Sequence, residues 1–256
     1  MNVPSELPTV TVITPTTGGK HLERAIEGVN NQTYKNIQHL IVVDGEHRIK
    51  DAEKIFDKVP PKNGDIIYLP YSVGSDGWNG HRVYGSMPYL AKGEWITYLD
   101  DDNWYEPNHI ETCLNNVSKN KTGWTFSLRK IVDKDGNYIC NDDCESLGKW
   151  PSILGDNDYF VDTSCYFMHR NLAISISSVW YRKFRQQGMV EVDRAVCQAL
   201  RHITQNSYTG TSKYTVNYAV GNTPQSVVGE FFIQGNKKML QKHNGKLPWK
   251  DEYIIL

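Results

Sequence analysis

The sequence predicts an α/β fold in which one mostly parallel sheet is flanked by helices. The short, almost wholly apolar runs at residues 10–14 and 37–43 are typical of strands that are buried on both faces. Between them, residues 21–32 carry apolar side chains at helical spacing, which predicts an amphipathic helix. A strand, a helix and a second strand of this kind indicate a parallel sheet whose faces are covered by helices.

The same alternation continues as far as a cluster of acidic residues. We expect a helix, a strand, a glycine-rich loop, a helix and a strand at residues 49–58, 66–69, 74–80, 82–91 and 95–99, in that order. The last strand runs directly into Asp100, Asp101 and Asp102, and Asp44 follows an earlier strand in the same way. Ligands of open α/β sheets gather beyond the carboxyl ends of the strands, so these carboxylates are candidates for a site.

The second half of the chain is less regular. We expect a helix at 107–119, a hairpin formed by 129–132 and 138–140, a strand at 164–169, and helices at 171–187 and 193–203. Residues 141–159 show no clear period. We predict a single domain at residues 1–220, with a nucleotide-sugar half at 1–110 and an acceptor half at 111–220, followed by a C-terminal extension at 221–256.

The composition is that of an ordinary globular protein, with 39% hydrophobic and 22% charged residues in a chain of 256. The formal net charge of -1 gives no general attraction to nucleic acid, so any polyanion site has to be local. The chain has no apolar stretch near the roughly 20 residues that cross a bilayer, and its first eight residues do not resemble a signal peptide. We therefore expect a cytoplasmic protein without a transmembrane segment, and peripheral contact with a membrane stays open.

The five cysteines are odd in number and scattered, which argues against a disulfide framework. Cys140 and Cys144 are close enough in sequence to be considered as zinc ligands, but no second pair of cysteines or histidines accompanies them at the spacing of a zinc site.

The three consecutive aspartates are the strongest chemical signal. Adjacent carboxylates repel one another and are costly to desolvate, so they need a cation or strong hydrogen-bond donors nearby. Mg²⁺ or Mn²⁺ meets that need, because hard divalent cations prefer oxygen ligands and share them with phosphates and water. If the strand geometry persists, Asp100 and Asp102 point to one side and Asp101 to the other. The alternative is a solvated acidic turn.

In this context the sequence resembles the family 2 glycosyltransferases of the GT-A fold. Residues 10–16, VTVITPT, are similar to that family's opening strand and nucleotide-binding turn. The resemblance implies that Pro15, Thr16 and Thr17 lie at the nucleotide.

Three further segments carry the resemblance. Residues 31–36, NQTYKN, and 41–44, IVVD, are similar to the family's helix end and second strand, whose terminal aspartate, here Asp44, binds the base or ribose. His81-Arg82 stands where the family has a basic residue near the nucleotide, which implies that role for Arg82.

Residues 99–103, LDDDN, resemble the family's Asp-X-Asp motif. The resemblance implies that Asp102 is the main metal ligand, with Asp100 as a second ligand, and that Asp100 and Asp101 contact the nucleotide sugar.

The remaining candidates come from the acceptor half. Inverting members use an acidic general base late in the domain, and Glu191-Val-Asp193 is similar to that segment, which implies Asp193 as the base and Glu191 as the reserve. Asp193 is equally compatible with a helix N-cap. Asp162 resembles a residue that shapes the acceptor side, or is a buried carboxylate bonded to backbone groups. Trp150 is a candidate to stack on an acceptor sugar, or covers the core.

The resemblance implies a metal-dependent glycosyltransferase of the hexosyltransferase type, using Mn²⁺ or Mg²⁺. We expect it to move a sugar, with inversion, from a UDP- or GDP-sugar to a hydroxyl of a glycan or lipid-linked glycan, in polysaccharide or surface glycan synthesis. Two alternatives stay open. One is a nucleotidyltransferase of similar fold, for which Gly18-Gly-Lys20 offers only part of a phosphate loop. The other is a noncatalytic sugar-binding domain.

Overall fold

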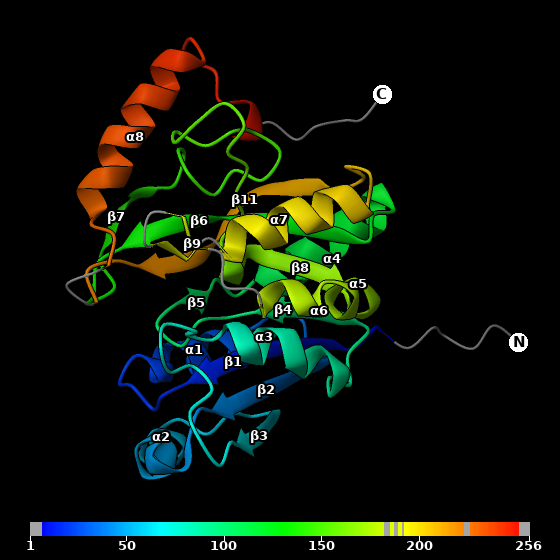
Figure 1. Ribbon diagram of the computed structural model, residues 1–256, viewed down its shortest axis with the longest axis vertical. Coiled ribbons are helices and arrows are strands. Elements are labelled where there is room, and N and C mark those ends of the chain that lie inside the picture. Colours follow the sequence, from blue (N-terminus) through cyan, green and yellow to red (C-terminus); the bar gives the residue numbers. More distant parts are fainter. Residues whose placement is uncertain (1–6, 182–184, 187–188, 191, 223–225, 251–256) are drawn as a thin grey trace, which may run out of the picture.

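A nine-stranded sheet organises the residues that the structure describes (Figure 1). The computed structural model describes residues 7–181, 185–186, 189–190, 192–222 and 226–250. The strand order is β3-β2-β1-β4-β8-β6-β11-β5, and β7 pairs with the end of β6. The strands are β1 (Val10–Thr16), β2 (Ile37–Val43), β3 (Gly64–Tyr68), β4 (Trp95–Tyr98), β5 (Trp104–Tyr105), β6 (Trp124–Val132), β7 (Tyr138–Asn141), β8 (Tyr166–His169) and β11 (Thr209–Ala219).

Strands β1, β2, β3, β4, β6 and β11 point the same way, whereas β5, β7 and β8 run against them. The expected mostly parallel sheet is therefore confirmed. Two short strands, β9 (Arg185–Gln186) and β10 (Met189–Val190), pair with each other outside this sheet. Because the carboxyl ends of β1, β4, β6 and β11 meet at one edge, groups from distant parts of the chain are brought together there.

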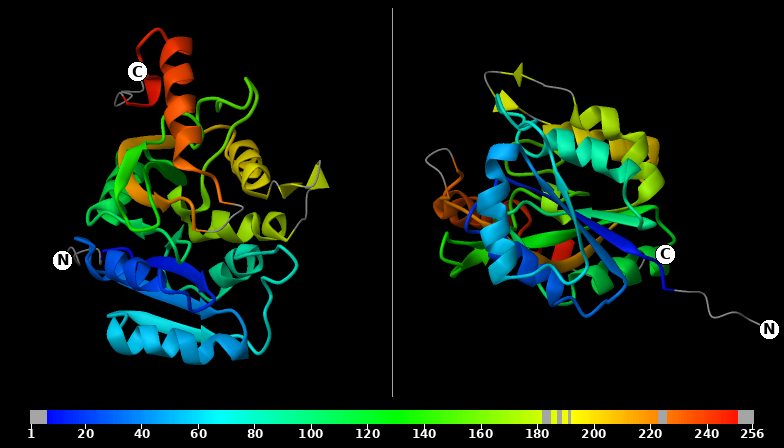
Figure 2. Two further views of the ribbon diagram at one scale, coloured as in Figure 1. Left: turned by 90° about the vertical axis from the view of Figure 1, so that its left-hand side faces the viewer. Right: turned by 90° about the horizontal axis from the view of Figure 1, so that it is seen from below.

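Helices pack against the sheet and against one another. They are α1 (Leu22–Asn30), α2 (Ile49–Lys58), α3 (His81–Ser86), α4 (His109–Asn120), α5 (Arg170–Ser175), α6 (Ser177–Trp180), α7 (Val192–Ile203) and α8 (Gly229–Lys242). Helix α4 lies against β6 and β11, while α6 lies between α3 and α7. Helices α2 and α8 stand at opposite ends of the molecule (Figures 1 and 2). No helix in the described ranges is both long and apolar enough to cross a membrane.

Two expected helices are shorter than their patterns predict. The helix at 82–91 ends at Ser86, and a 3₁₀ turn (Met87–Tyr89) with Pro88 in its first positions follows it. In the described part of the helix expected at 171–187, the chain forms α5 and α6, which meet at Ile176, and residues 185–186 belong to β9. Residues 182–184 and 187 of that expected helix lie outside the described residues. The Ser175 hydroxyl donates to the carbonyl of Leu172, and serine hydroxyls that bond to nearby carbonyls compete with regular helix.

The sequence analysis missed β11, an eleven-residue strand that lies between β6 and β5. Its residues alternate without a clear apolar face, and Ser212 has a φ of 55°. The pairing register with β6 shifts twice between Gly210 and Val216. A strand with such irregularities lacks the strict period of two that a sequence pattern needs.

The C-terminal segment packs on the acceptor half. Helix α8 contacts β7 and β6. Trp249 is buried in a final 3₁₀ turn (Pro248–Lys250), with its ring centroid 6.0 Å from that of Trp150. The division of the chain into a domain at 1–220 and an extension stays a prediction.

Arg129 on β6 is a buried cation that binds three carboxylates of the acceptor half. Its side chain is 1% exposed and makes ion pairs with Asp142 at 2.8 Å, Glu145 at 2.6 Å and Asp162 at 2.6 Å. These pairs tie the irregular segment at 141–162 to the sheet. A buried cation with three buried or half-buried anions is stable only while all partners are present.

Replacing this cation should destabilise the protein strongly. Arg129→Met removes the cation from Asp142 and Asp162 and leaves Glu145 with only Arg194, at 3.5 Å. The free energy of unfolding should therefore fall by about 3–5 kcal/mol in urea titrations. The adjacent Lys130, whose pair with Glu106 is about a third exposed, provides the control. Lys130→Met should cost less than about 1 kcal/mol. An equal decrease in the free energy of unfolding in the two variants would mean that the buried ion pairs of Arg129 contribute no more to stability than an exposed pair.

Candidate active site

Asp101 is fixed to the end of β1. The Thr16 hydroxyl donates to its carboxylate at 2.6 Å, and the Thr17 amide donates to the same oxygen at 3.4 Å. Burial raises the pKa of Asp101 to about 6, although the Thr16 bond opposes this shift. The first strand and the acidic segment, 85 positions apart, are therefore joined directly, as their shared sheet edge predicts.

Asp100 turns toward the interior. It accepts hydrogen bonds from the Tyr84 hydroxyl of α3, from Ser164 at 3.3 Å and from Asn103 at 3.4 Å. Burial raises its pKa well above the usual range, and the negative charges of Asp162 and Asp102 add to the effect. Neither Tyr84 nor Ser164 was a sequence-based candidate.

Asp102 points toward the C-terminal third of the chain. Its carboxylate accepts a hydrogen bond of 2.8 Å from the side-chain amide of Asn222, which follows β11. The other end of that amide, Asn222 Oδ1, is buried and has no hydrogen-bond partner in the part of the chain that the structure describes. Nothing in the sequence indicated Asn222, because the pairing spans 120 positions and depends on the unpredicted strand.

The expected alternation of the three aspartates is wrong. Strand β4 ends at Tyr98, and the amide of Asn103 donates to the carbonyl of Asp100, which closes a turn. The three carboxylates therefore face three different partners and not two sides of a strand. Over the described residues, no three His, Cys, Asp or Glu side chains converge on one point as a metal cage.

Asp193 lies in the first turn of α7, at the same sheet edge. Its carboxylate accepts a hydrogen bond of 3.1 Å from Thr163 and lies 3.9 Å from His81 Nε2. Burial lowers the pKa of His81, and the charge of Asp193 opposes that shift. Asp193 is the second residue of the helix, and its side chain reaches across to another element. Glu191 lies outside the described residues.

Two neighbouring hydroxyls connect Asp193 with the acidic turn. Thr163 bonds to Asp193, and the next residue, Ser164, bonds to Asp100. Both belong to one 3₁₀ turn (Thr163–Cys165), so the two carboxylates flank the same short element. The structure thus brings the candidate base and the candidate metal-binding turn together.

Asp162 has a structural role. It pairs with Arg129 and accepts a hydrogen bond of 3.0 Å from the amide of Ser164, as the cap of the 3₁₀ turn. Burial raises its pKa to about 6, against the effect of Arg129. This is the buried, bonded carboxylate of the alternative interpretation, and it positions Ser164 next to Asp100.

Trp150 is not part of this site. It packs against Trp249 and lines a cavity at the amino end of β11. A role in stacking on an acceptor beside the aspartates has no support from this position.

Asp44 binds a loop of its own chain. It accepts hydrogen bonds from the Ser72 hydroxyl at 2.9 Å, the Val73 amide at 2.6 Å and the Gly74 amide at 2.9 Å. The approach is close enough that a Cβ at Gly74 would lie 2.6 Å from the Asp44 carboxylate. Asp44 therefore shapes the glycine-rich loop, and its contact with a base or ribose stays a prediction.

Arg82 reaches the same loop from α3. Its guanidinium donates to the Val73 carbonyl at 3.2 Å and lies 4.0 Å from the ring centroid of Trp78. Tyr181 stacks on Trp78 with centroids 5.2 Å apart. Arg82 is thus held against aromatic faces beside the Asp44 loop, and its nucleotide contact stays a prediction, as do those of Pro15, Thr16 and Thr17.

The loop contacts of Asp44 give a direct test. Asp44→Ala removes the acceptor of the Val73 and Gly74 amides, so hydrogen exchange at these two amides should accelerate at least about tenfold, or 1.4 kcal/mol. Ser72→Ala removes only the hydroxyl donor, so it should leave the exchange of both amides nearly unchanged. Slow exchange at Val73 and Gly74 in Asp44→Ala would show that other contacts fix the loop.

The comparisons agree with this architecture. The family model described as glycosyl transferase family 2 matches residues 11–169, which include Thr16, Asp44 and the three aspartates but not Asp193 or Asn222. The chain belongs to glycosyl transferase family 2.

Among curated proteins, an uncharacterized glycosyltransferase of Rickettsia bellii is 30% identical over 135 residues, which are 52% of this chain and 19% of that protein. A GalNAc(5)-diNAcBac-PP-undecaprenol beta-1,3-glucosyltransferase of Campylobacter jejuni is 26% identical over 133 residues, which are 51% of this chain and 41% of that protein. The matches thus span less than half the length of these relatives.

Among solved structures, S. aureus TarS 1-349 in complex with UDP-GlcNAc superposes with a TM-score of 0.58 at 13% sequence identity. The superposition covers 91% of this chain and 66% of that chain. At this identity the likeness establishes the fold, and the expected GT-A architecture is confirmed.

Proposed function

We propose that the protein is a metal-dependent, inverting glycosyltransferase that moves a hexosyl group from a UDP- or GDP-sugar to an acceptor hydroxyl. One observation carries the proposal. Asp100, Asp101 and Asp102 lie together at the sheet edge, and the ion pairs described for the chain include none from Lys or Arg to any of them. Their partners are hydroxyls and amides, which leaves the negative charge uncompensated.

A divalent cation suits this edge. Asp102 offers a carboxylate, and the unpartnered Oδ1 of Asn222 offers a second oxygen next to it. These are hard ligands of the kind that Mg²⁺ and Mn²⁺ share with phosphates and water, so few protein ligands suffice. When bound, such an ion neutralises charge that develops on the leaving nucleoside diphosphate. Asp100, bonded to Tyr84 and Ser164, is the weaker candidate for direct ligation.

The protein's own groups then organise the displacement. Thr16 orients Asp101, and Arg82 and Asp44 order the loop at 72–74 on the nucleotide side. The acceptor oxygen forms a bond to the anomeric carbon while the bond from that carbon to the phosphate oxygen breaks. The acceptor proton passes to the Asp193 carboxylate, which Thr163 holds in place. A single displacement of this kind inverts the anomeric configuration.

The relatives support the choice of substrates. The name of the C. jejuni protein describes transfer onto a polyprenol-linked glycan, and the TarS structure holds UDP-GlcNAc. On these grounds we propose a UDP-sugar in preference to a GDP-sugar, a glycan or lipid-linked glycan as acceptor, and a role in polysaccharide or surface glycan synthesis.

Removal of the main metal ligand tests the first half of the mechanism. Asp102→Ala should reduce Mn²⁺-dependent turnover of a UDP-sugar by at least about a hundredfold, since it removes stabilisation of the leaving group. Its thermal unfolding should stay within a few degrees of the unmodified protein. Chelation with EDTA should have the same effect as the substitution. The exposed Asp135→Ala is the matched control and should retain full turnover. Metal-dependent turnover that survives in Asp102→Ala would contradict the assignment.

Asp193 is tested by separating catalysis from donor binding. Asp193→Asn keeps the size of the side chain but cannot accept the proton, so kcat should fall about 10²–10⁴-fold. The affinity for UDP with Mn²⁺, measured by thermal shift, should change less than about threefold. A fall in nucleotide affinity that accounts for the whole loss would place Asp193 in donor binding instead.

A further inference from the structure

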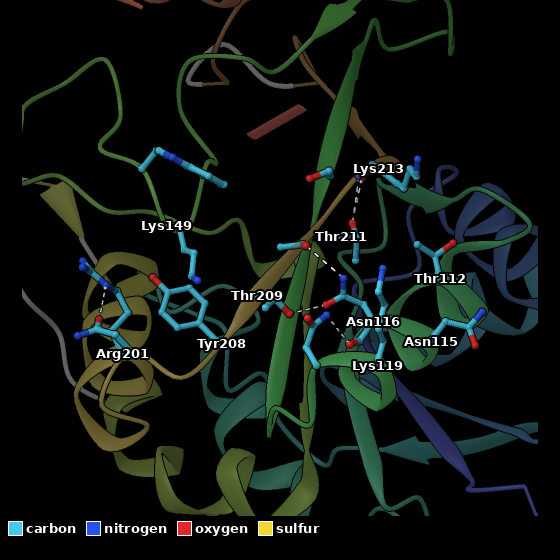
Figure 3. A pocket seen from close by; sticks show the side chains of 15 residues that line it. Thr112, Asn115, Asn116, Lys119, Lys149, Arg201, Tyr208, Thr209, Thr211 and Lys213 are labelled. Carbon is cyan, nitrogen blue, oxygen red and sulfur yellow. Dashed lines mark hydrogen bonds between the residues drawn. The ribbon is translucent and has the colours of Figure 1, made fainter. Parts of the chain in front are cut away.

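A cavity lies at the amino end of β11, and Figure 3 shows the side chains that line it. Its volume is about 630 Å³, and it is bounded by the second half of α4, the amino end of β11, the end of α7 and the segment at 149–150. Figure 3 shows Lys149 and Tyr208 on one side of the cavity and Lys119 and Thr112 on the other. This volume falls in the range of pockets that enclose a small organic ligand.

The cavity is separate from the proposed donor site. Lys213 on β11 lines the cavity. Ala219, at the other end of the same strand, donates a hydrogen bond from its amide to the side chain of Asn103 in the acidic turn. Six residues of strand, at about 3.3 Å each, separate the two by about 20 Å. The lining residues of the cavity include none of the candidate donor-site residues.

The charge of the lining has one sign. Lys119, Lys149, Arg201 and Lys213 line the cavity, and among the residues that the structure describes no Asp or Glu lines it. Lys119 and Arg201 stand near the ends of α4 and α7, where basic side chains also complement the helix dipole. Lys149 and Lys213 have no such role, because they lie on a loop and on β11. The four positive groups therefore come from four separate elements.

The walls between the charges suit sugar rings. Trp150, which is half-buried, contributes an aromatic side chain to the lining. Tyr208 is only 2% exposed and stacks on Trp124 with ring centroids 4.1 Å apart, so it forms part of the base below Lys149 and is not an open face. Asn116 is fixed by hydrogen bonds with Thr125, Thr209 and the carbonyl of Gly210, so the floor is rigid. Asn115, which is exposed, adds an amide that can meet hydroxyl groups. Aromatic faces with amides and cations at their rim are suited to polar rings that carry negative charge.

We propose that this cavity binds a short segment of an anionic glycan, with sugar rings that carry carboxylate or phosphate groups. The choice of a glycan rests on the proposed function, since an enzyme that extends a glycan has to hold a chain away from its reacting end. The cavity would bind that distal part of the acceptor.

Binding of defined oligosaccharides in the absence of any donor tests the proposal. Isothermal titration calorimetry at about 0.15 M salt would compare tetragalacturonate, phosphorylated maltotetraose and neutral maltotetraose. At least one of the anionic tetramers should bind at least tenfold more tightly than maltotetraose. Tighter binding of tetragalacturonate identifies a carboxylate ligand, and tighter binding of the phosphorylated sugar identifies a phosphate ligand.

Charge reversal assigns the binding to the cavity. Lys119→Glu with Lys149→Glu should weaken the anionic tetramer at least tenfold, because both side chains are exposed and can be changed without loss of the fold. The same change of charge on α8, Lys237→Glu with Lys238→Glu, is the control and should stay within twofold. Equal weakening in both double variants would show only a general charge effect and would overturn the proposal.

Two more outcomes separate the proposal from its rivals and from the proposed function. Equal affinity for neutral and anionic tetramers, or tighter binding of a single-stranded octanucleotide, would overturn a site for anionic glycans. Binding of UDP with Mn²⁺, titrated separately, should be the same in the cavity variant and the unmodified protein. If the protein fails to bind UDP, the donor site is wrong, while the result for the tetramers still decides the cavity.

Discussion

The ion pairs of Arg129 hold the acceptor half of the protein in place. One buried guanidinium binds Asp142, Glu145 and Asp162, and these three carboxylates fix the ends of a segment with little regular structure. Asp162 then caps the 3₁₀ turn whose hydroxyls contact Asp100 and Asp193. The position of the proposed base relative to the acidic turn thus depends on a contact that is itself remote from any reacting atom.

The carboxylates around Arg129 and those of the acidic turn differ in the partners that hold them. Three carboxylates share the single positive charge of Arg129, and Arg194 lies 3.5 Å from one of them, Glu145. Removing the Arg129 cation would leave buried charge without its main partner, which is costly. Asp100 and Asp101 of the acidic turn have only neutral hydrogen-bond donors in the described ranges, and burial raises the pKa of both carboxyl groups. In the proposed mechanism, binding of the metal and the nucleoside diphosphate offsets the cost of burying these carboxylates.

The sequence was most informative where the structure is local and regular. The first two strands, the helix between them and the acidic residues after β4 followed from short patterns, and parallel strand ends explain why Thr16 meets Asp101. Patterns failed where contacts join distant segments. Tyr84 lies on a helix that the sequence predicted, but its contact with Asp100 joins two elements and follows from no local pattern. Asn222 reaches Asp102 from the end of β11, the strand that the sequence analysis missed.

The geometry of the acidic turn was also beyond the sequence. An extended strand would have sent Asp100 and Asp102 to one side, but the chain turns after Tyr98, and each carboxylate takes a separate partner. Likewise, Asp44 and Arg82 were identified by resemblance as nucleotide contacts, whereas the structure adds the loop that both residues hold. A sequence motif indicates which side chains lie near one another. The hydrogen bonds that orient those side chains can be identified only in the three-dimensional structure.

Acidic and basic side chains lie at opposite ends of β11. The net charge of the whole chain was therefore a poor guide to the charge of its ligands. The formal net charge of -1 excludes a general attraction to polyanions, yet it averages an acidic edge and a cavity with four cationic side chains. The cavity and the acidic turn are separated by about 20 Å along β11, which exceeds the Debye length of about 8 Å at physiological salt, so the proposed ligand of each end is little affected by the charges of the other. The acidic edge can therefore attract a cation while the opposite edge attracts an anion. Because both edges include residues of β11, the distance between the two sites is fixed by that strand.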